Sequence, residues 1–499
     1  MGAPKRGPLA RLGGLSYPRA IGLITAVGAV LRFAIMARQP LGYDEDFTAV
    51  VVHQPVDRMI DMVSRDSAPP LFYLLERAVV AVSDLAGLAT LGGPGGTVAL
   101  RLVPSLAGIA VIPLLAALGR RVGGDRAGLW TALFAALVPT TVMLSGFVRM
   151  YGLGATLTVA SALLLWRAVE KPGSAARWAA YVAVAAAAVW TDYFCVVALG
   201  GIFAAAIWLR PGWRTAIKAA LATGVAVASI APWLDVAREQ FQHTGQGFWV
   251  PPLGFSMLGG TSFQLFMGPP IDWGLPFGMV LVVLQWFAVT AGFAALAWSL
   301  VAWWRLGPEG RRAGVYCLLA AGGVALLAAI SIWRPLLDAR YASVMWLPLF
   351  ALVGVGLAAM PRRVATLLLV AVTVPTLALG VAITHSQTSS LVPDLEAQVG
   401  PHDVAVAQWD HYLILLDESS PTLRSRLHVL STGELPWYLG TAAYPPGAVL
   451  TAIPADVVAD HGLVFWVAAP GVGAPALPDG YHSLRVRCVI QACLTVYGP

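Results

Sequence analysis

Long apolar runs alternate with short basic loops from about residue 20 to residue 384. A helix needs about 20 mostly apolar residues to cross a bilayer, and many of these runs approach that length. The pattern therefore predicts a polytopic α-helical membrane protein with about 11 transmembrane helices. The predicted spans are residues 20–37, 102–118, 128–146, 152–168, 178–191, 194–209, 216–234, 276–303, 314–332, 342–359 and 364–384.

The basic residues between these runs predict their orientation. Lys5, Arg6 and Arg11 precede the first span, and Arg120 and Arg121 follow the second. Short loops rich in Lys and Arg remain in the cytoplasm. The N-terminus is therefore expected in the cytoplasm and the C-terminal tail outside it, in a multi-pass protein of the plasma (inner) membrane.

Two polar stretches interrupt the regular alternation on the outer side. Residues 38–100 are predicted to form a first outer loop with interfacial helices. Within it, the short apolar segment 69–88 carries Glu76, Arg77 and Asp84, which favours a helix lying in the interface. A membrane crossing by this segment is the open alternative. Residues 235–274 are predicted to form a second, long outer loop.

The chain changes character after residue 384. Short apolar stretches such as 403–407 and 462–468 alternate with Pro and Gly turns, a pattern typical of strands. We therefore expect a transmembrane module at residues 1–384 and a small extracytoplasmic α/β domain at residues 385–499. Cys488 and Cys493 lie in this second part, where an oxidising environment would favour a disulfide between them.

Composition narrows the possible functions. The chain is 58% hydrophobic and 12% charged, whereas soluble domains carry about 25% charged residues. The net charge of +6 combines a basic membrane part with a tail in which ten acids oppose four arginines. The basic excess lies in short loops between apolar runs, where it sets membrane orientation. It is not the footprint of a nucleic-acid-binding protein.

Three consecutive carboxylates, those of Asp44, Glu45 and Asp46, follow the first apolar run directly. Charge at a membrane boundary is costly, so such a cluster indicates a function. Other acids, arginines and aromatic residues are expected at the same outer surface. Carboxylates suit deprotonation of a hydroxyl group, and arginines suit the binding of a phosphate.

Five motifs, in their order and spacing, resemble those of the C-type (GT-C) membrane glycosyltransferases. The likeness covers roughly residues 20–385 and is greatest to the bacterial relatives of protein O-mannosyltransferases and the lipid A aminoarabinose transferases. The motifs are Tyr43–Glu45, Asp66–Tyr73, Arg101–Gly108 with Gly119–Arg121, Ser145–Leu153 and Asp338–Tyr341.

This resemblance implies inverting transfer of a sugar from a polyprenyl-phosphate donor at the outer membrane surface. By position, Asp44 would be the catalytic base, with Glu45 orienting or tuning it. Asp66 would line the donor or acceptor pocket. The remaining candidates for substrate binding are Tyr43, Arg101, Arg149, Tyr151, Asp192, Tyr193, Arg340 and Tyr341, of which Arg149, Tyr151, Arg340 and Tyr341 would contact the donor phosphate.

Structural roles compete with several of these assignments. Asp44 could be a solvated acid at a helix end, and Asp46 is better explained as a structural or capping residue. Arg149 and Arg340 could anchor the chain at the interface. Arg101 could be an ion-pair partner inside the bundle. Asp192 stands before Tyr193 where relatives often have His, which leaves its role open.

The expected function is transfer of a mannose or a pentose such as arabinose to a lipid or cell-wall glycan. The partners would be the polyprenyl-phosphate sugar, the glycan or glycolipid acceptor and the membrane. No metal ligand set is recognisable, so metal-independent transfer is expected, with a divalent cation as the open alternative. A transporter or a lipid-linked-sugar flippase is the alternative function; it would place charges near the membrane midplane. A membrane scaffold would leave the acid cluster unexplained.

Overall fold

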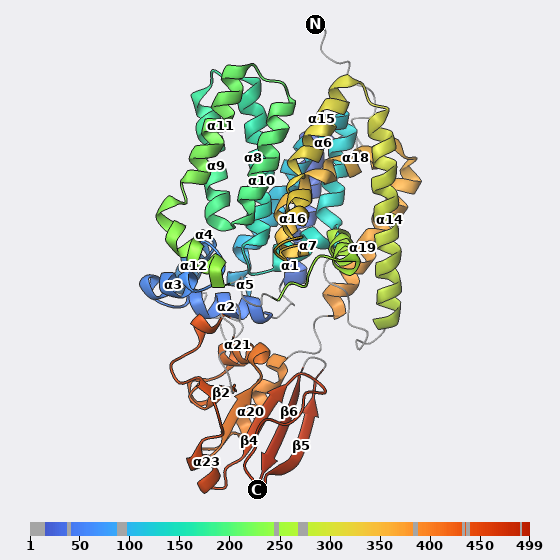
Figure 1. The fold of residues 1–499 in the computed structure, drawn as a ribbon. Coiled ribbons are helices and arrows are strands. Elements are labelled where there is room, and N and C mark those ends of the chain that lie inside the picture. The colour runs from blue at the N-terminus through green and yellow to red at the C-terminus, as the bar shows by residue number, and fades with distance from the viewer. Residues whose placement is uncertain are drawn as a thin grey trace.

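The computed structural model describes residues 15–36, 41–86, 97–243, 249–267, 278–382, 388–431, 435, 440–489 and 492–499. Figure 1 shows a bundle of long helices and, at one end of it, a smaller domain built on a β-sheet. The predicted fold class is therefore confirmed. The predicted domain boundary at residues 384 and 385 lies outside the described residues.

Within the described residues, seven helical segments are long and apolar enough to cross a membrane. Two shorter apolar helices accompany them, α9 (Ala175–Thr191) and α10 (Phe194–Trp208). The exact number of eleven crossings stays a prediction. The seven segments are Tyr17–Ile35, Val98–Leu137, Tyr151–Glu170, Trp213–His243, Val282–Trp304, Pro308–Ile330 and Ala339–Ala359.

The helices of these segments follow the predicted apolar runs. Several runs are divided by short breaks, and one 3₁₀ turn, η3 (Leu347–Leu349), joins α17 to α18. The bounds are α1 (Tyr17–Met36), α5 (Thr97–Leu100), α6 (Leu102–Leu137), α7 (Pro139–Gly146), α8 (Tyr151–Glu170), α11 (Trp213–Ala228), α14 (Gly278–Trp304), α15 (Pro308–Ala320), α16 (Gly323–Ile330), α17 (Ala339–Trp346), α18 (Phe350–Ala359) and α19 (Arg362–Ala382).

Helix α6 joins two predicted spans, 102–118 and 128–146, into a hairpin. Gly123 and Gly124 have non-helical backbone angles, and Gly124 has a φ of 75°, which glycine adopts readily. A Cβ atom on Gly119 would lie 2.1 Å from Oγ1 of Thr131. Twelve residues of straight helix would separate these positions by about 18 Å. The chain therefore reverses its direction at the two glycines.

Short helices cover the end of the bundle that faces the sheet domain. They are α2 (Tyr43–Val52), α3 (Val56–Ser64), α4 (Leu71–Leu85) and α12 (Leu234–His243), near one another in Figure 1. Helix α4 corresponds to the predicted interfacial segment 69–88 and is not among the candidate spans. The predicted outer loop at 235–274 is partly helical where the structure describes it. That part contains α12, which continues the preceding span after the 3₁₀ turn η2 (Ala231–Trp233), and α13 (Phe255–Met267).

The C-terminal part folds around a six-stranded sheet with the order β3-β2-β1-β4-β6-β5. Strands β1 to β4 pair in parallel, and β6 and β5 add antiparallel strands at one side. The predicted strands at 403–407 and 462–468 are β1 and β4, which are buried on both faces, as central parallel strands usually are. The strands are β1 (Val404–Ala407), β2 (Leu427–Leu430), β3 (Val449–Leu450), β4 (Val464–Ala468), β5 (His482–Cys488) and β6 (Cys493–Gly498).

Small helices complete this domain and connect it to the bundle. They are η5 (Thr388–Leu391), α20 (Val392–Gln398), α21 (Trp409–Glu418), α22 (Pro421–Arg424), η7 (Thr441–Ala443) and α23 (Ala455–Ala459). Cys488 and Cys493 form a disulfide that links β5 to β6. Helix α21 packs against α2. The sheet domain therefore lies directly against the helix that carries the acid cluster.

Candidate active site

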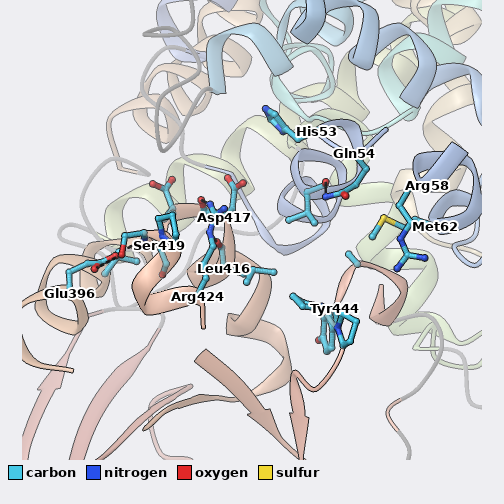
Figure 2. Close-up of a pocket in the computed structure, with 18 of the residues that line it drawn as sticks. His53, Gln54, Arg58, Met62, Glu396, Leu416, Asp417, Ser419, Arg424 and Tyr444 are labelled. Atoms are coloured by element: carbon cyan, nitrogen blue, oxygen red, sulfur yellow. Dashed lines mark hydrogen bonds between the residues drawn. The ribbon is translucent and has the colours of Figure 1, made fainter. Parts of the chain in front are cut away.

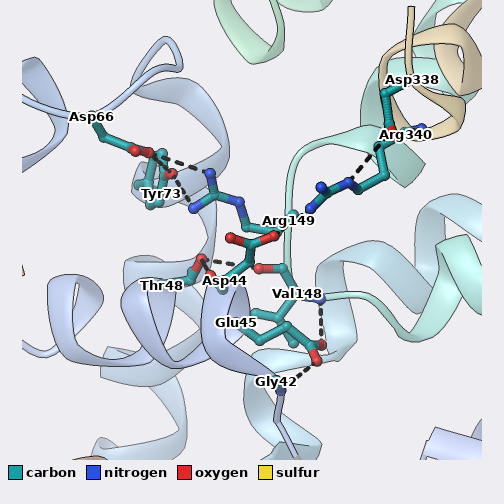
Figure 3. A network of polar contacts seen from close by, with 10 residues as sticks. All are labelled: Gly42, Asp44, Glu45, Thr48, Asp66, Tyr73, Val148, Arg149, Asp338 and Arg340. Atoms are coloured by element: carbon teal, nitrogen blue, oxygen red, sulfur yellow. Dashed lines mark hydrogen bonds and ion pairs between the residues drawn. The ribbon is translucent and has the colours of Figure 1, made fainter. Parts of the chain in front are cut away.

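The acid cluster begins α2. Gly42 precedes the helix, and its backbone N–H donates to Oε2 of Glu45 at 2.9 Å. The Glu45 side chain thus provides a hydrogen-bond acceptor for the backbone N–H of the residue that precedes α2, as the acidic residue of a capping box does. Figure 3 shows that the carboxylates of Asp44 and Glu45 leave this turn in different directions. The local capping geometry therefore separates two neighbouring acids.

Glu45 is committed to the fold. Its Oε1 accepts the backbone N–H of Val148 at 2.8 Å and lies 3.4 Å from Nη2 of Arg101. The hydroxyl of Thr48 donates to the carbonyl of Val148, so α2 binds both the N–H and the C=O of this residue. Burial raises the pKa of Glu45, opposed by Arg101 and the two N–H donors. These contacts suit a positioning residue.

Asp44 faces a different environment. Its Oδ2 lies 2.5 Å from Nη1 of Arg340, and the two side chains are 39% and 33% exposed. Nε of Arg340 lies 3.3 Å from Oδ1 of Asp338, the residue that caps α17. The guanidinium also lies over the ring of Trp249, 4.3 Å from its centroid. A carboxylate and a rigidly held cation therefore meet beside solvent.

A second arginine lies next to this pair but is buried. Nη1 of Arg149 donates to the hydroxyl of Tyr73 at 3.0 Å, and Nη2 lies 3.4 Å from Oδ2 of Asp66. The Tyr73 hydroxyl itself donates to Asp66 at 2.8 Å. Nε of Arg149 has no hydrogen-bond partner among the described residues. In Figure 3, Arg149 lies between Asp66 on one side and Asp44 on the other.

Aromatic side chains line the same region. Tyr341, next to Arg340, stacks on Phe194 with ring centroids 4.5 Å apart. Its ring also lies 6.1 Å from that of Tyr151 and 6.3 Å from that of Trp249. These rings belong to α17, α10, α8 and the segment before α13. Four separate parts of the chain therefore meet beside the arginines.

Asp192 and Tyr193 diverge from one another. Asp192 is buried, and its Oδ1 accepts the N–H of Phe194 at 2.8 Å, whereas Oδ2 has no partner in the described part of the chain. Burial raises the pKa of Asp192 to about 7, opposed by this N–H and by Arg149. The hydroxyl of Tyr193 instead donates to Gln240 on α12 at 2.6 Å. The contacts of these two neighbours thus differ, and their role in substrate binding stays a prediction.

Two other predicted substrate contacts are directed elsewhere. The hydroxyl of Tyr43 lies 3.1 Å from that of Tyr444 in the sheet domain, and its ring packs edge-on against Trp409. Arg101 is buried and pairs with Glu45, which fits the structural alternative. Both residues hold α2 in place rather than lining the space near Asp44.

One buried cation near the site, Arg32, is not among the residues predicted from the sequence. Arg32 in α1 is 2% exposed, and its guanidinium donates to the carbonyls of Ala135 and Ala136 at the end of α6. Its Nε donates to the hydroxyl of Ser145 at 2.8 Å. Carbonyls in the last turn of a helix lack partners within the helix, which explains the bonds. Arg32 thereby fixes the segment that leads to Val148 and Arg149.

The arrangement combines a carboxylate able to accept a proton with two guanidinium groups able to bind an oxyanion. Arg340 is the accessible one, and Arg149 is oriented by Asp66 and Tyr73. Among the described residues, no group of three or more His, Cys, Asp or Glu side chains is placed to hold a metal ion. Together, these features suit proton abstraction beside an anionic group.

The fold and the motifs place the chain among known structures. It has the GT-C membrane fold, as the motifs predicted. Residues 80–235 match the family described as dolichyl-phosphate-mannose-protein mannosyltransferase. No curated protein matches the sequence of the chain at a significant level.

Two solved structures of ArnT from Cupriavidus metallidurans are similar over nearly the whole chain. The apo structure has a TM-score of 0.57 at 16% identity, covering 96% of this chain and 98% of ArnT. The structure bound to undecaprenyl phosphate has a TM-score of 0.57 at 15% identity, with coverages of 95% and 97%. Both parts of this chain, bundle and sheet domain, are thus included in the likeness of fold.

Proposed function

We propose that this protein is a glycosyltransferase that moves a sugar from a polyprenyl-phosphate donor to an acceptor hydroxyl. The observation that carries the proposal is the pair of Asp44 and Arg340, a third exposed, beside the buried Arg149. The partial family match and the fold shared with a protein crystallised with undecaprenyl phosphate support it. Neither the pair nor the fold requires a nucleotide-sugar donor.

In the proposed reaction, Asp44 removes the proton from the acceptor hydroxyl as its oxygen attacks the anomeric carbon of the donor sugar. The bond from that carbon to the phosphate oxygen breaks, and polyprenyl phosphate leaves with the electron pair. Attack from the face opposite the phosphate inverts the anomeric configuration. Arg340 stabilises the departing charge directly. Arg149 supports it from the wall of the site.

Arg340 has to exchange its bond to Asp44 for bonds to the phosphate when the donor binds. This exchange would release the Asp44 carboxylate for the acceptor hydroxyl, so donor binding would prepare the base. Guanidinium groups can supply the charge stabilisation that a metal ion supplies elsewhere. We therefore expect transfer to continue when divalent cations are removed with EDTA, and its loss would show that a cation takes part.

We propose mannose or a pentose such as arabinose as the transferred sugar, and a lipid or cell-wall glycan as the acceptor. The site would lie on the outer face of the plasma membrane. Arg121 pairs with Glu170 at the far end of α8, about 28 Å along the helix from Tyr151 at 1.5 Å per residue. The basic end of the bundle is thus opposite the site, as cytoplasmic loops would be.

This topology can be tested by labelling with a membrane-impermeant maleimide in intact cells. Asp479→Cys lies on the sheet domain and is expected to react. Glu309→Cys at the start of α15 is expected to react only after the cells are opened. The reverse pattern would place the site in the cytoplasm.

The function is tested with Asp44→Asn in membranes supplied with a radiolabelled polyprenyl-phosphate sugar. Loss of a general base lowers a rate by about a hundred- to ten-thousand-fold, so transfer should fall by that factor. Asp57→Asn changes an exposed acid on the neighbouring helix α3 and should leave transfer unchanged. Normal transfer by folded Asp44→Asn protein would refute the catalytic role. Movement of the lipid-linked sugar across the membrane without transfer would favour a flippase.

A further inference from the structure

A large cavity separates the first outer helices from the sheet domain. Its volume is about 1020 Å³, at the upper end of the roughly 300–1,000 Å³ typical of ligand sites. Val50, His53 and Gln54 line it from the end of α2, and Asp417 lines it from α21. Figure 2 shows side chains from both parts of the chain around this space. The cavity is distinct from the Asp44 site, which lies at the beginning of α2.

Most charged groups of the cavity are already engaged. Arg58 pairs with Asp61 at 2.7 Å. Arg424 donates to the carbonyls of Leu416 and Asp417 at the end of α21. The carboxylate of Glu396 accepts the N–H and the hydroxyl of Ser420. These groups therefore build the wall and have few bonds left for a ligand.

Two carboxylates remain available. Asp417 and Glu418 line the cavity, and neither carboxylate has a hydrogen bond or ion pair among the described residues, although His53 and Arg424 lie close enough to Asp417 to oppose the effect of burial on its pKa. Asp46 lies behind them, 1% exposed, with an Oδ2 atom that also lacks a partner there. Asp417 and Glu418 thus give the cavity two carboxylates that can accept hydrogen bonds. A ligand rich in hydroxyl groups would satisfy them.

The negative charge of the cavity lining also restricts which ligands can bind. The lining contains three carboxylates and two arginines, and both arginines are engaged as described. Burial raises the pKa of Asp46, and the carboxylates of Asp417, Glu45 and Glu418 raise it further, so this side of the cavity already holds several acids. A phosphorylated or carboxylated ligand would meet the same repulsion. An uncharged ligand would not.

Apart from His53, Gln54, Ser419 and Ser420, the remaining lining is largely apolar. Tyr444, Pro445 and Pro446 form one wall, and Leu416 and Met62 contribute to others. Sugar rings combine apolar C–H faces with hydroxyl edges, and amphipathic aromatic residues such as tyrosine match both. The cavity thus offers apolar surfaces for ring faces and carboxylates for hydroxyl edges.

Helix α2 connects this cavity to the reacting centre. Asp44 is in the first turn of the helix and His53 follows its end, so the two positions lie about 14 Å apart along the axis. A short chain of sugar rings could extend over that distance. We propose that the cavity binds an uncharged oligosaccharide segment of the acceptor while the end of that segment reaches Asp44. The role of this saccharide as the acceptor rests on the proposed function, whereas its binding in the cavity does not.

The test uses the purified full chain in lipid nanodiscs and a photoreactive, uncharged α-1,6-mannotetraose as the probe. Cross-linking followed by peptide mapping should label the peptides with Asp417 and Tyr444. Unlabelled mannotetraose should compete, whereas tetragalacturonate at the same concentration should compete at least tenfold less well. The double variant Asp417→Asn with Glu418→Gln should remove this difference. The control Asp456→Asn, an exposed acid outside the cavity, should keep it.

A second variant fills part of the cavity without changing the charge of its lining. Gln54→Trp should reduce labelling at least tenfold in protein that still elutes as a single folded species. No labelling of the cavity by mannotetraose, equal competition by tetragalacturonate, or full labelling of Gln54→Trp would each overturn the proposal. Because cross-linking requires no donor and no turnover, a protein that binds the saccharide but transfers nothing would refute the proposed function alone.

Discussion

The carboxylates of Asp44 and Glu45 come from consecutive residues, yet they are 39% and 8% exposed. Glu45 bonds to Gly42, Val148 and Arg101, whereas the Asp44 carboxylate pairs with the cation of Arg340 at a solvent-facing position. The chemistry of the two acids is similar, so their surroundings must determine their tasks. Asp44 can exchange partners during a reaction, and Glu45 cannot without disturbing the fold.

Replacement of Glu45 is therefore expected to affect stability first. Glu45→Ala leaves the buried guanidinium of Arg101 without its carboxylate, which typically costs about 3–5 kcal/mol. Asp44→Asn breaks a pair that is a third exposed, so its effect should be within about 1 kcal/mol. Denaturant unfolding of the two variants would measure the difference. Equal destabilisation would contradict the separate roles.

Arg340 is expected to act through its shape as well as its charge. Arg340→Lys keeps the positive charge but loses the planar fork and the contact with the Trp249 ring. Loss of one hydrogen bond to a charged group is worth about 1.5–3 kcal/mol, or roughly a 10- to 150-fold fall in kcat/KM for the donor. Steady-state transfer rates at varied donor concentration would measure it. Arg65→Lys on α3 should have no effect, and a normal kcat/KM for Arg340→Lys would remove Arg340 from the donor site.

Some of the predicted site residues lie together in the structure, and others do not. The structure brings Asp44, Arg149, Tyr151, Arg340 and Tyr341 into one region, although their roles stay predictions. The hydroxyl groups of Tyr43 and Tyr193 instead bond to Tyr444 and Gln240. These partners could not be predicted, because Tyr444 is distant in sequence and Gln240 lies on a helix that was not predicted. Motif order alone could not reveal which face of a helix each side chain occupies.

At the scale of helices, apolar length was the informative signal. It predicted α1, α8 and α14 closely, and it placed two separate spans on either side of the reversal at Gly123 and Gly124, but it could not find α12 in a polar stretch. Helix α12 has Glu, Arg and Gln in its sequence, which resembles a loop when only membrane spans are sought. The signal that could have found it is its amphipathic spacing.

Close packing of α6 against α7 is expected to control the position of Arg149. A Cβ atom on Gly108 would lie 1.8 Å from the hydroxyl of Ser145 and 3.3 Å from Nε of Arg32. Gly108→Ala should therefore displace Ser145, break its bond to Arg32 and shift the following loop. Overpacking of this kind costs typically about 1–3 kcal/mol, and a fall in kcat should accompany it.

Gly200→Ala provides the matched control for this prediction. Gly200 is also helical, in α10, but a Cβ atom there would meet nothing within 4 Å. Alanine is favoured over glycine in a helix by roughly 0.5–1 kcal/mol, so this variant should be as stable as the parent or slightly more so. Thermal unfolding and transfer assays on both variants would test the difference. A similar result for the two would show that the contact with Ser145 is unimportant.

At the scale of the whole molecule, the sheet domain is part of the environment of α2. Gly440 approaches Phe47 so closely that a Cβ atom would lie 2.7 Å from the ring, and Tyr444 bonds to Tyr43. Tyr43 and Tyr444 are separated by 401 positions, so no local pattern could predict the bond. The distribution of charge and the number of predicted spans could indicate only that the tail lies outside the cytoplasm. The contact itself makes the acid cluster dependent on the C-terminal domain.

This interface is expected to be sensitive to pH through Asp46. Burial, together with Asp417, Glu45 and Glu418, raises the pKa of Asp46 well above its usual value, opposed by Arg101. The folded protein therefore retains a proton that the unfolded chain loses above about pH 4. A group with a raised folded pKa stabilises fully below the unfolded pKa, and this stability falls as the pH rises toward the folded pKa. Docking of the sheet domain should weaken over that range.

Asp46→Asn removes this titration while keeping a similar shape. The variant should match the parent near pH 4 and be more stable at pH 7.5, where the parent must keep Asp46 protonated or bury its charge. Some pH dependence should remain, because burial also raises the pKa values of Asp417 and Glu418. Limited proteolysis between the bundle and the sheet domain, with thermal unfolding at both pH values, would measure the effect. Asp456→Asn on α23 should behave like the parent, and an Asp46→Asn protein that loses stability at pH 7.5 would mean that Asp46 is ionised and stabilised by a partner.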